Sequence, residues 1–569
     1  MRLSKESILI RHCDNSAWQC ADNSIAALRS LRLPARNLLP APLKKVKLWH
    51  MDISPEKMLL LSFFACLVGI AHAYIWPSPQ LDALEAMRFD PNPFLAFLPS
   101  CDADDPLSGR SEISDWIRTA YHDMATHNVV HGTGGMDASI RFAEEQARPE
   151  DAGDGFQNTI GELLKFSNRY VSISDVLALA AITAVERCGG PQIAFRGGRI
   201  DAGEPNAPGV PEPQQSLDSH IASFARQGFT QTEMIGLVAC GHTFGGVQHA
   251  PFPDIVPEMN DPNNTLSVAH FDSTYVQFDN NIATEYISGT TQNPLVVGLN
   301  ETTNSDKRIF SSDGNVTMHS FADSPELFAS TCAGLFARML DTVPNGVQLT
   351  EVITPLPVKP DVTLLRLDTS GHKLELLVSV RFWNMAEDPA RIVRLLWVDH
   401  IGGTSNVTLS GFFTVGQQQQ AQRYSPPTSL SIDAAAGITA MRFEVNGKLE
   451  DQGGIGFPVQ DDVVMSALSC FIADGPSPGR FYIAVRTSAK PTRVYLEAEA
   501  RDSVDRPIVV EIDAVPPSEP VAANVSYSIW RVGLNANQTF DLFTVGAEFN
   551  GVKGTRSGLL TRFKFPPCE

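Results

Sequence analysis

An arginine and a histidine stand four positions apart in the segment Arg118-Thr-Ala-Tyr121-His122-Asp123. Residues four apart share one face of a helix, and apolar residues recur around this pair at helical spacing. A histidine can accept and return a proton near neutral pH, and a guanidinium can stabilise negative charge that develops on a reacting atom. The segment therefore offers acid–base chemistry, although the pair alone is also compatible with a solvated helix surface.

A second histidine follows an apolar run, in Leu237-Val-Ala-Cys-Gly-His242-Thr243-Phe-Gly. Small residues beside it would let a flat, bulky ligand approach the end of a helix. Taken alone, His242 is equally compatible with a buried core histidine whose hydrogen bonds are satisfied. Helical spacing of apolar residues predicts helices that position these groups, at residues 113–125, 172–187, 217–228 and 230–246.

Together the two segments resemble the haem peroxidase superfamily of plants, fungi and bacteria. In that family a distal helix carries Arg-x-x-aromatic-His-Asp, and a proximal helix carries Gly-His-Thr or Gly-His-Ser. The resemblance extends over about residues 98–340, where further segments match in order: 134–139, 175–180, 190–201, 271–279 and 312–313. It implies an all-α haem peroxidase fold that binds haem b and reacts with hydrogen peroxide.

The resemblance also assigns roles to individual residues. His242 would ligate the iron, and Asp313 would accept a hydrogen bond from its other ring nitrogen. His122 would move a proton between the two peroxide oxygens, while Arg118 would stabilise the leaving oxygen. Phe271 would be the aromatic residue on the proximal side.

The distal side departs from the family pattern at two places. Tyr121 stands where the family has Phe or Trp, and its phenol could donate a hydrogen bond, be oxidised, or simply pack. The family orients the distal histidine with Glu and, six residues later, Asn. Here the matching pair is Glu145 and Asp151, although the nearby Asn158 leaves the alignment open.

Two calcium sites are implied by the same resemblance, since oxygen-rich residues follow each histidine and Ca²⁺ prefers several oxygen ligands. The distal set is Asp123, the Gly135 carbonyl, Asp137 and Ser139. The proximal set is Thr243, Asp272, Thr274 and Asp279. Each set is also compatible with a capped loop that binds no metal.

Specialised donor sites of the family are missing. Of the three carboxylates of manganese oxidisers only Asp115 remains, a surface Trp is replaced by Leu237, and the Arg of ascorbate users is replaced by Pro251. The sequence therefore predicts peroxide-dependent oxidation of small reducing substrates, chiefly phenols. The alternative is a haem-binding or cell-wall-binding protein whose peroxidase activity is vestigial.

Residues 59–73 form an apolar run that ends in Ala-His-Ala, as expected of a secretory signal peptide, with a signal anchor as the rival interpretation. Because about 50 residues precede it, translation could start at Met51 or Met58. Six glycosylation sequons support secretion to the extracellular space. They begin at Asn263, Asn300, Asn315, Asn406, Asn524 and Asn537.

Six cysteines follow the signal run, which permits three disulfides in an oxidising compartment. The resemblance favours Cys101–Cys188, because the fungal branch bridges similar positions. Cys470–Cys568 would link the C-terminus to its own domain. Cys240 and Cys332 remain, as a third bridge or as free thiols.

Beyond a proline-rich segment at 351–360, short β-branched and aromatic runs alternate with turn residues. They predict an all-β, sandwich-like region. The expected organisation is a multi-domain chain: leader 1–73, helical peroxidase domain 74–350, linker 351–360, and β region 361–569 of one or two modules. The strings FFTVG at 412–416 and LFTVG at 542–546 hint at an internal repeat.

The formal net charge of −20 argues against nucleic acid as a partner, because nucleic-acid binding depends on Lys and Arg. We expect no membrane contact after signal cleavage, and a monomer. The β region would either contact a polysaccharide or cell-wall polymer, or only cover part of the helical domain.

Overall fold

The computed structural model describes residues 74–568 except 98–99, 102–106, 416–419, 473–478, 520–524, 535–541, 556–559 and 562–565. The expected signal peptide, Cys13, Cys20 and Cys66, and the sequons at Asn524 and Asn537 lie outside the described residues. Within the described part of the chain, no helix is both long and apolar enough to cross a membrane.

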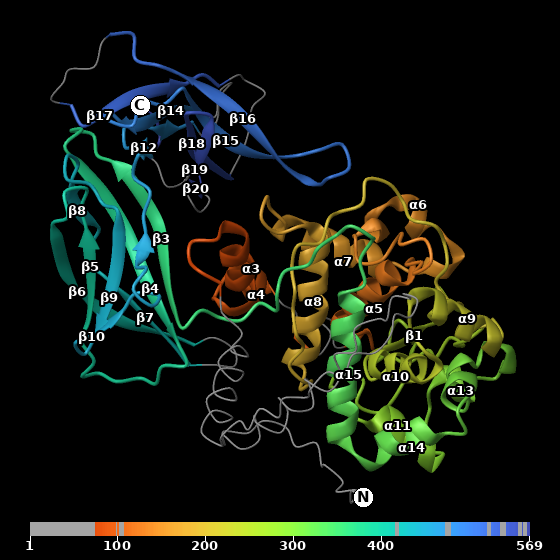
Figure 1. The fold of residues 1–569 in the computed structure, drawn as a ribbon. Helices are drawn as coiled ribbons and strands as arrows, with labels where there is room; N and C mark the ends of the chain where they lie inside the picture. The colour runs from red at the N-terminus through yellow and green to blue at the C-terminus, as the bar shows by residue number, and fades with distance from the viewer. Residues whose placement is uncertain are drawn as a thin grey trace, which may run out of the picture. The chain divides into compact units, whose positions relative to one another are not determined.

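Helices make up the first part of the described chain (Figure 1). They are α3 (Pro79–Phe89), α4 (Pro93–Phe97), α5 (Glu112–Ala125), α6 (Ala143–Gln146), α7 (Gly155–Leu163), α8 (Ile173–Arg187), α9 (Leu217–Gln227), α10 (Gln231–Gly241), α11 (Asn281–Ser288), α12 (Pro294–Val297), α13 (Ser305–Phe310), α14 (Val316–Asp323) and α15 (Pro325–Leu340). Short 3₁₀ helices η1 (Ser139–Arg141), η2 (Pro149–Asp151), η3 (Leu164–Phe166) and η4 (Glu301–Thr303) lie between them, and strands β1 (Gly246–Gln248) and β2 (Val268–His270) pair after α10. The four helices predicted around the motifs are confirmed as α5, α8, α9 and α10.

Local sequence explains where the central helices begin. Thr230 accepts a hydrogen bond from the Glu233 backbone N–H, and the Glu233 side chain accepts one from the Thr230 backbone N–H, a capping box that starts α10. At the start of α8 the Ser172 side chain accepts a hydrogen bond from the Asp175 backbone N–H and so caps the helix. Helix α8 is buried along almost its whole length, as its continuous Ala, Leu, Val and Ile sequence requires, and it forms the centre of the helical core.

Three disulfides cross-link the described part of the chain. Cys101–Cys188 and Cys470–Cys568 are present, which confirms both predicted pairings. The third bridge joins Cys240 of α10 to Cys332 of α15, so the alternative that these two are free thiols is wrong. This bridge ties the helix that ends at His242 to the last helix of the region.

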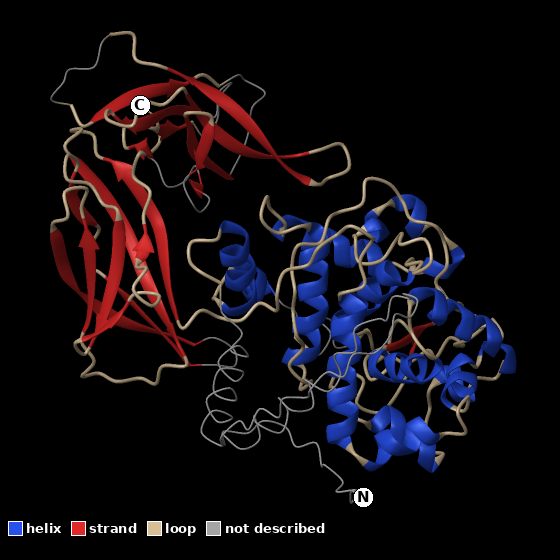
Figure 2. Ribbon diagram, in the orientation of Figure 1, coloured by secondary structure: helices blue, strands red, loops and turns tan. Residues whose placement is uncertain are grey.

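Strands follow from Val358, and Figure 2 shows helices and strands occupying separate parts of the chain. The first group is β3 (Val358–Leu367), β4 (Lys373–Trp383), β5 (Val393–Val398), β6 (Thr404–Val415), β7 (Gln420–Ser425), β8 (Leu430–Asp433), β9 (Ala440–Val445), β10 (Lys448–Glu450) and β11 (Phe457–Pro458). The second group is β12 (Val463–Ser466), β13 (Cys470–Phe471), β14 (Gly479–Arg486), β15 (Arg493–Arg501), β16 (Pro507–Val515), β17 (Tyr527–Val532), β18 (Leu542–Phe549), β19 (Val552–Thr555) and β20 (Leu560–Thr561). The fold class, helical peroxidase-type region followed by β region, is as predicted.

The pairings between these strands are mostly antiparallel. In the first group β4 pairs with β3, β7 and β8, while β5 pairs with β6 and β9. In the second group β14 pairs with β12 and β17, and β15 pairs with β16 and β18. The pair β12–β3 is parallel and connects the two groups. The repeated strings lie on β6 and β18, one in each group, and a true duplication stays a prediction.

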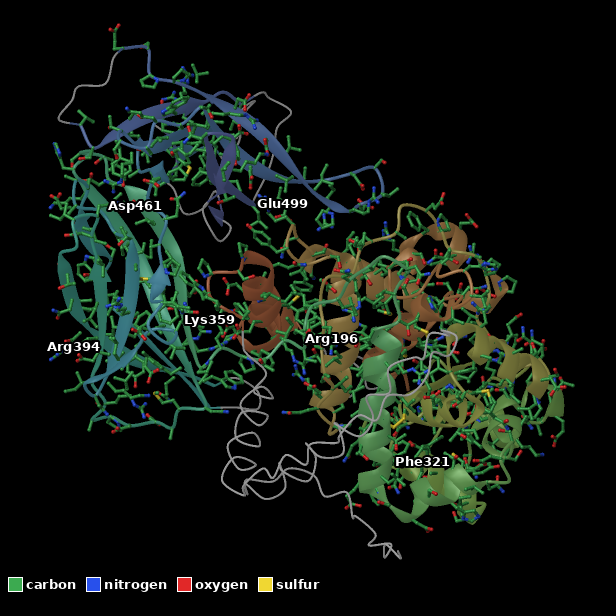
Figure 3. All side chains as sticks on the ribbon, viewed as in Figure 1. Arg196, Phe321, Lys359, Arg394, Asp461 and Glu499 are labelled. Atoms are coloured by element: carbon green, nitrogen blue, oxygen red, sulfur yellow. A yellow bond between two sulfur atoms is a disulfide. The ribbon has the colours of Figure 1, made fainter. Side chains whose placement is uncertain are left out.

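Buried ion pairs join helix α3 to the first strands. The Glu85 carboxylate is fully buried and binds the Arg381 guanidinium, while Lys359 Nζ, labelled in Figure 3, lies 3.4 Å from Glu85 Oε2. Asp90 accepts hydrogen bonds from Arg381 at 2.8 Å and from Arg423 at 2.5 Å. Since buried charges are tolerated only when paired, these contacts fix how α3 packs on β3 and β4.

The hairpin β15–β16 also contacts the helical region. Arg501 donates to the Leu164 carbonyl at 3.1 Å and to the Ser167 hydroxyl at 2.8 Å. Arg141, at the end of η1, donates to the Val504 carbonyl of the hairpin at 3.2 Å. The segment 351–360, which we expected as a linker, contains the first residues of β3. The helices that precede it contact the strands that follow it.

Candidate active site

A cavity of about 530 Å³ brings the two motif histidines into one space. Helix α5 contributes Arg118, Tyr121 and His122 to its lining, and the end of α10 contributes His242. Phe271 and Asp306 also line it, together with loop residues between 149 and 155 and between 211 and 214. Helices α5 and α10 therefore place two sequence motifs, 120 residues apart, around a single pocket.

His122 is held by an aspartate. Its Nδ1 lies 2.6 Å from Asp151 Oδ1, and its ring lies 4.7 Å from that of Phe156. Burial lowers the pKa of His122 to about 4; the Asp151 hydrogen bond opposes this shift and the Arg118 cation adds to it. The imidazole is therefore neutral at physiological pH. With Asp151 accepting from Nδ1–H, the lone pair of Nε2 is available as a base.

Glu145 does not share in orienting His122, contrary to our expectation. Its Oε1 accepts a hydrogen bond from the Asn206 backbone N–H, and burial raises the pKa of its carboxyl to about 7. Helix α6 places Glu145 beside the loop that carries Ser139, whereas η2 places Asp151 against α5. Asp151 alone therefore contacts the histidine ring among the described carboxylates.

Arg118 lies on α5 one turn before His122. Its Nη2 donates to the Ala152 carbonyl at 2.9 Å, and its guanidinium lies 4.3 Å from the centre of the Phe156 ring. Burial lowers the pKa of Arg118, which the nearby Asp115 and Asp151 oppose. Within the described residues it forms no ion pair at 4 Å or less, so its positive charge remains available to a ligand in the cavity.

Tyr121 packs rather than reaching across the cavity. Its ring stacks on Phe224 with 6.1 Å between the ring centres and meets the His122 ring edge-on. Burial raises the pKa of the phenol, with the facing Gln227 side chain opposing the shift. The geometry thus favours the packing interpretation among those that the sequence left open.

His242 caps the C-terminus of α10 and contacts two groups. Its backbone N–H donates to the Val238 carbonyl at 2.9 Å, and its ring lies 4.1 Å from Phe271 at an interplanar angle of 9°. Its Nδ1 lies 2.8 Å from Asp306 Oδ2. Phe271 therefore stacks on the His242 ring, and its role as the proximal aromatic residue stays a prediction.

The assignment of Asp313 as the partner of His242 is wrong, because Asp306 occupies that position. Asp313 instead accepts hydrogen bonds from the Thr317 N–H at 3.0 Å and from the Thr317 hydroxyl at 2.6 Å, at the start of α14. The dipeptide Ser-Asp occurs at 305–306 and again, seven residues later, at 312–313. Helix α13 directs only the first of them, Asp306, towards α10.

Asn293 is a site residue that the sequence did not reveal. It is fully buried, caps α12, and donates from Nδ2 to Asp306 Oδ2 at 2.8 Å. No motif marks it: a helix-capping Asn before Pro294 is a common pattern with a purely structural interpretation. Only the packing of α12 against α13 reveals its contact with the aspartate.

The proximal oxygen-rich residues converge as predicted. Thr243 Oγ1 donates to the Asp279 carbonyl at 2.9 Å, and Asn281 Nδ2 donates to Thr274 Oγ1 at 3.1 Å. Asp272 Oδ1 accepts from the Thr274 N–H at 3.0 Å, while Asp272 Oδ2 is buried without a hydrogen-bond partner. Burial, reinforced by Asp279, raises the pKa of Asp272 to about 7. A buried carboxylate oxygen without a donor fits a cation ligand.

The distal set is also brought together. Asp123 Oδ2 accepts from the Asp137 N–H at 3.0 Å, and Asp137 Oδ1 accepts from the Ser139 N–H at 3.1 Å. Burial and the neighbouring Asp137 raise the pKa of Asp123. Asn206, which the sequence did not single out, directs its side-chain amide at Asp137 and Ser139, 3.0 and 2.9 Å away.

The Gly135 carbonyl, also expected to bind this ion, forms no hydrogen bond recorded among the described residues, and its N–H donates to Thr126 Oγ1. No group of three or more His, Cys, Asp or Glu side chains in the described structure could hold a metal alone. Hydroxyl, amide or carbonyl oxygens would have to complete either calcium set.

Comparison with known proteins agrees with this geometry. Residues 103–323 match the family model described as Peroxidase. The chain is 36% identical over 348 residues to a WSC domain-containing protein of Arthroderma benhamiae, covering 60% of this chain and 48% of that protein. It is 31% identical over 185 residues to L-ascorbate peroxidase 5, peroxisomal, of Arabidopsis thaliana, covering 32% and 61%. It is 32% identical over 133 residues to the mitochondrial cytochrome c peroxidase of Emericella nidulans, covering 23% and 37%.

The helical region thus matches the Peroxidase family model at residues 103–323, and a large, mostly antiparallel β-sheet region follows it. The chain spans about half to three fifths of the length of the first two relatives. This match is the ground on which we propose, below, a haem enzyme that acts on hydrogen peroxide.

Proposed function

We propose that this protein is a secreted haem peroxidase that reduces hydrogen peroxide and oxidises small, mainly phenolic, donors. One observation carries the proposal: a buried His122 with a lowered pKa and an Arg118 without an ion pair among the described residues share one cavity with His242, whose Nδ1 contacts Asp306. These are the groups that peroxide cleavage at a haem needs, and they come from two helices, α5 and α10.

The residues present fit haem b. Because Asp306 engages His242 Nδ1, the Nε2 atom is the nitrogen left to ligate iron. The cavity has room for a flat ligand beside the ring of His242 and is lined largely by apolar residues such as Phe244, Val247 and Ile309. When bound, haem b would supply the iron at which the peroxide O–O bond is cleaved and from which donors are oxidised.

The protein's own contribution is proton transfer and charge stabilisation. His122 Nε2 would take the proton from the inner oxygen of hydrogen peroxide, since its low pKa keeps the ring neutral and Asp151 holds the proton on Nδ1. It would then deliver that proton to the outer oxygen, which leaves as water. Arg118 would stabilise the negative charge on the leaving oxygen while its own position is fixed by the Ala152 carbonyl and Phe156.

Two calcium ions are part of the proposal. The proximal ion would be bound by Thr243, Asp272, Thr274 and Asp279. The distal ion would be bound by Asp123, the Gly135 carbonyl, Asp137 and Ser139. Support comes from the buried, unpartnered Asp272 Oδ2 and from the two clusters of buried carboxylates. Each ion would neutralise its cluster and hold the backbone next to a catalytic or ligating histidine.

Export and the role of the β region complete the proposal. Three disulfides and the exposed sequon asparagines Asn263, Asn300 and Asn406 support an oxidising, extracellular destination. We further propose that the β region contacts a polysaccharide or cell-wall polymer, and that the protein acts as a monomer. Retention of the full chain on insoluble polysaccharides, compared with an unrelated secreted protein, tests the polymer contact.

The experiment that tests the activity is peroxide-dependent oxidation of a phenolic dye by the haem-loaded full chain. The proposal expects turnover that requires both peroxide and haem. The matched variants are His122→Ala, within the cavity, and His319→Ala, an exposed histidine of α14 outside it. Turnover should fall steeply in the first and stay unchanged in the second. Haem binding without turnover would favour the alternative, a haem-binding or wall-binding protein with vestigial activity.

A further inference from the structure

The hydrogen bonds around Asp306 show an unusual sharing of one oxygen atom. His242 Nδ1 and Asn293 Nδ2 both lie 2.8 Å from Asp306 Oδ2. The other oxygen, Oδ1, has only the long contact of 3.4 Å from the Ser305 hydroxyl. Two N–H donors therefore share the same carboxylate oxygen directly behind the proposed iron ligand.

The orientation of the Asn293 amide is fixed by its second contact. Asn293 Oδ1 accepts a hydrogen bond from the Leu295 N–H at 2.8 Å as the N-cap of α12. Turning the amide over would direct its oxygen at the Asp306 carboxylate and its NH₂ at an N–H group. The hydrogen-bond partners of both amide atoms thus assign Nδ2 as the donor to Asp306 and Oδ1 as the acceptor from the Leu295 N–H.

Burial makes this second donor effective. Asn293 is fully buried and Asp306 is 1% exposed, so no solvent competes for the carboxylate oxygen. The Asn293 backbone N–H donates to Thr291 Oγ1 at 3.1 Å, and its carbonyl accepts from the Val296 and Val297 N–H groups at 2.9 Å. The Asn293 side chain is therefore held next to Asp306 by several hydrogen bonds at the start of α12.

We propose that Asn293 is a positioning residue that tunes the proximal histidine through Asp306. By donating to the oxygen that accepts from His242, it reduces the basicity of that oxygen and so limits the electron density passed to the imidazole. Hydrogen bonding behind an axial histidine sets ligand basicity and hence the reduction potential of the iron. Asn293 keeps this potential higher than the His242–Asp306 pair alone would. The inference rests on the proposed role of His242 as iron ligand.

The test uses the haem-loaded full chain and the variant Asn293→Ser. Serine is a comparable N-cap residue, so it keeps the acceptor for the Leu295 N–H, but it is too short to donate to Asp306. The control is Asn92→Ser. Asn92 likewise accepts from a helix N–H, that of Leu95, and donates from Nδ2 to a protein oxygen, the Ala86 carbonyl, but it does not line the cavity.

Two readouts are measured besides turnover: the Fe(III)/Fe(II) midpoint potential and the iron–histidine stretching frequency of the ferrous protein. In Asn293→Ser the equilibrium constant for reduction should fall about threefold to tenfold, the latter being 59 mV for one electron. The stretching frequency should rise, because the ligand becomes more electron-rich. Asn92→Ser should change neither quantity.

Several outcomes would overturn the proposal. One is a haem-loaded Asn293→Ser protein with an unchanged or higher potential. Another is an equal shift in an Asp306→Asn background, where the shared acceptor is altered and the effect of Asn293 should vanish. If the serine variant does not bind haem, Asn293→Thr serves as a second capping variant without the donor, with the same expectations. Absence of an iron–histidine stretch in the unmodified protein would overturn the proposed function as well.

Discussion

The two sides of the cavity present the same pair of side chains in different surroundings. On the α5 side His122 Nδ1 lies 2.6 Å from Asp151, and on the α10 side His242 Nδ1 lies 2.8 Å from Asp306. Around His122 the neighbours are a guanidinium and the Phe156 ring, whereas His242 stacks on Phe271. The proximal aspartate also receives a second N–H donor, which none of the described contacts provides at Asp151.

This difference shows that a His–Asp pair does not by itself determine the chemical role of the histidine. A carboxylate on Nδ1 fixes the tautomer and frees Nε2 in both cases. On the α5 side, burial and the nearby Arg118 cation lower the pKa of His122, and we propose its Nε2 as a base. At a helix end next to small residues and a parallel aromatic ring, the free nitrogen of His242 is the one that we propose as the iron ligand. The role follows from what surrounds the pair, and each side can be altered separately.

Removing the distal base should give the largest effect. His122→Ala is expected to slow the reaction of the haem-loaded protein with hydrogen peroxide by about 10²–10⁴-fold, the usual contribution of general acid–base catalysis. Stopped-flow absorbance at the haem band measures this rate. His319→Ala, on exposed α14, should react like the unmodified protein. An unaffected rate in His122→Ala would show that the distal pair is not the base.

Removing calcium should lower the stability of the fold and loosen the loop next to His242. At free calcium 100-fold above its dissociation constant one ion would stabilise the fold by about 2.7 kcal/mol, so a chelator should lower the melting temperature measurably. The double variant Asp272→Ala, Asp279→Ala should reproduce the loss in the presence of calcium. In the chelated protein the proximal loop should loosen and the haem spectrum should shift towards six-coordinate, low-spin iron.

The contradicting result is equally direct. If metal analysis of the purified protein finds no calcium, and EDTA changes neither melting temperature nor spectrum, then both loops are metal-free and the calcium assignment is wrong. Differential scanning fluorimetry with and without added calcium gives the comparison.

Substituting each of the two candidate proximal aspartates in turn should show which of them supports His242. Asp306→Asn removes the anionic acceptor of His242 and is expected to lower haem affinity or peroxide reactivity by about 10–100-fold, as such supporting residues commonly do. Asp313→Asn should change neither, because Asp313 accepts only from Thr317 at the start of α14 in the described structure. The same haem titration and peroxide kinetics serve both variants. Equal effects in the two would contradict the assignment.

The pH dependence should shift when the distal aspartate loses its charge. The pKa of His122 is about 4, and since the base must be neutral, the peroxide rate should fall as pH drops through that value and be flat above it. Asp151 raises this pKa, so Asp151→Asn should move the acid limb to lower pH. Rate constants measured between about pH 3 and 7 test the direction. A limb that moves upward would mean that Asp151 does not act on His122 as described.

Motifs of adjacent residues could be interpreted from the sequence, and contacts between distant segments could not. Arg118 and His122 share one helix face, and Gly241-His242-Thr243 is continuous, so the resemblance to the haem peroxidases could assign their expected roles from short, unbroken segments. Asp306 lies 64 residues from His242, and a second Ser-Asp occurs at 312–313. Only the packing of α13 and α12 against α10 distinguishes these aspartates and brings Asn293 into the site.

The same contrast holds for the fold. Helical spacing and β-branched runs predicted the order of helices and strands, and cysteine positions predicted two bridges. The third bridge required knowing that α10 lies against α15. Some contacts of the β region with the helices use arginines that donate to backbone carbonyls, such as Arg501 with the Leu164 carbonyl, and such contacts leave no pattern in the sequence.

The central claim is that His122 and His242 act on opposite sides of one bound haem. The most direct test mixes the haem-loaded full chain with one equivalent of hydrogen peroxide and follows the haem absorbance by stopped flow at neutral pH. The account predicts a rapid, single-step spectral change that a phenolic donor then reverses, because a neutral His122 is ready to accept the proton. A haem spectrum that peroxide leaves unchanged, or that only bleaches, would contradict it.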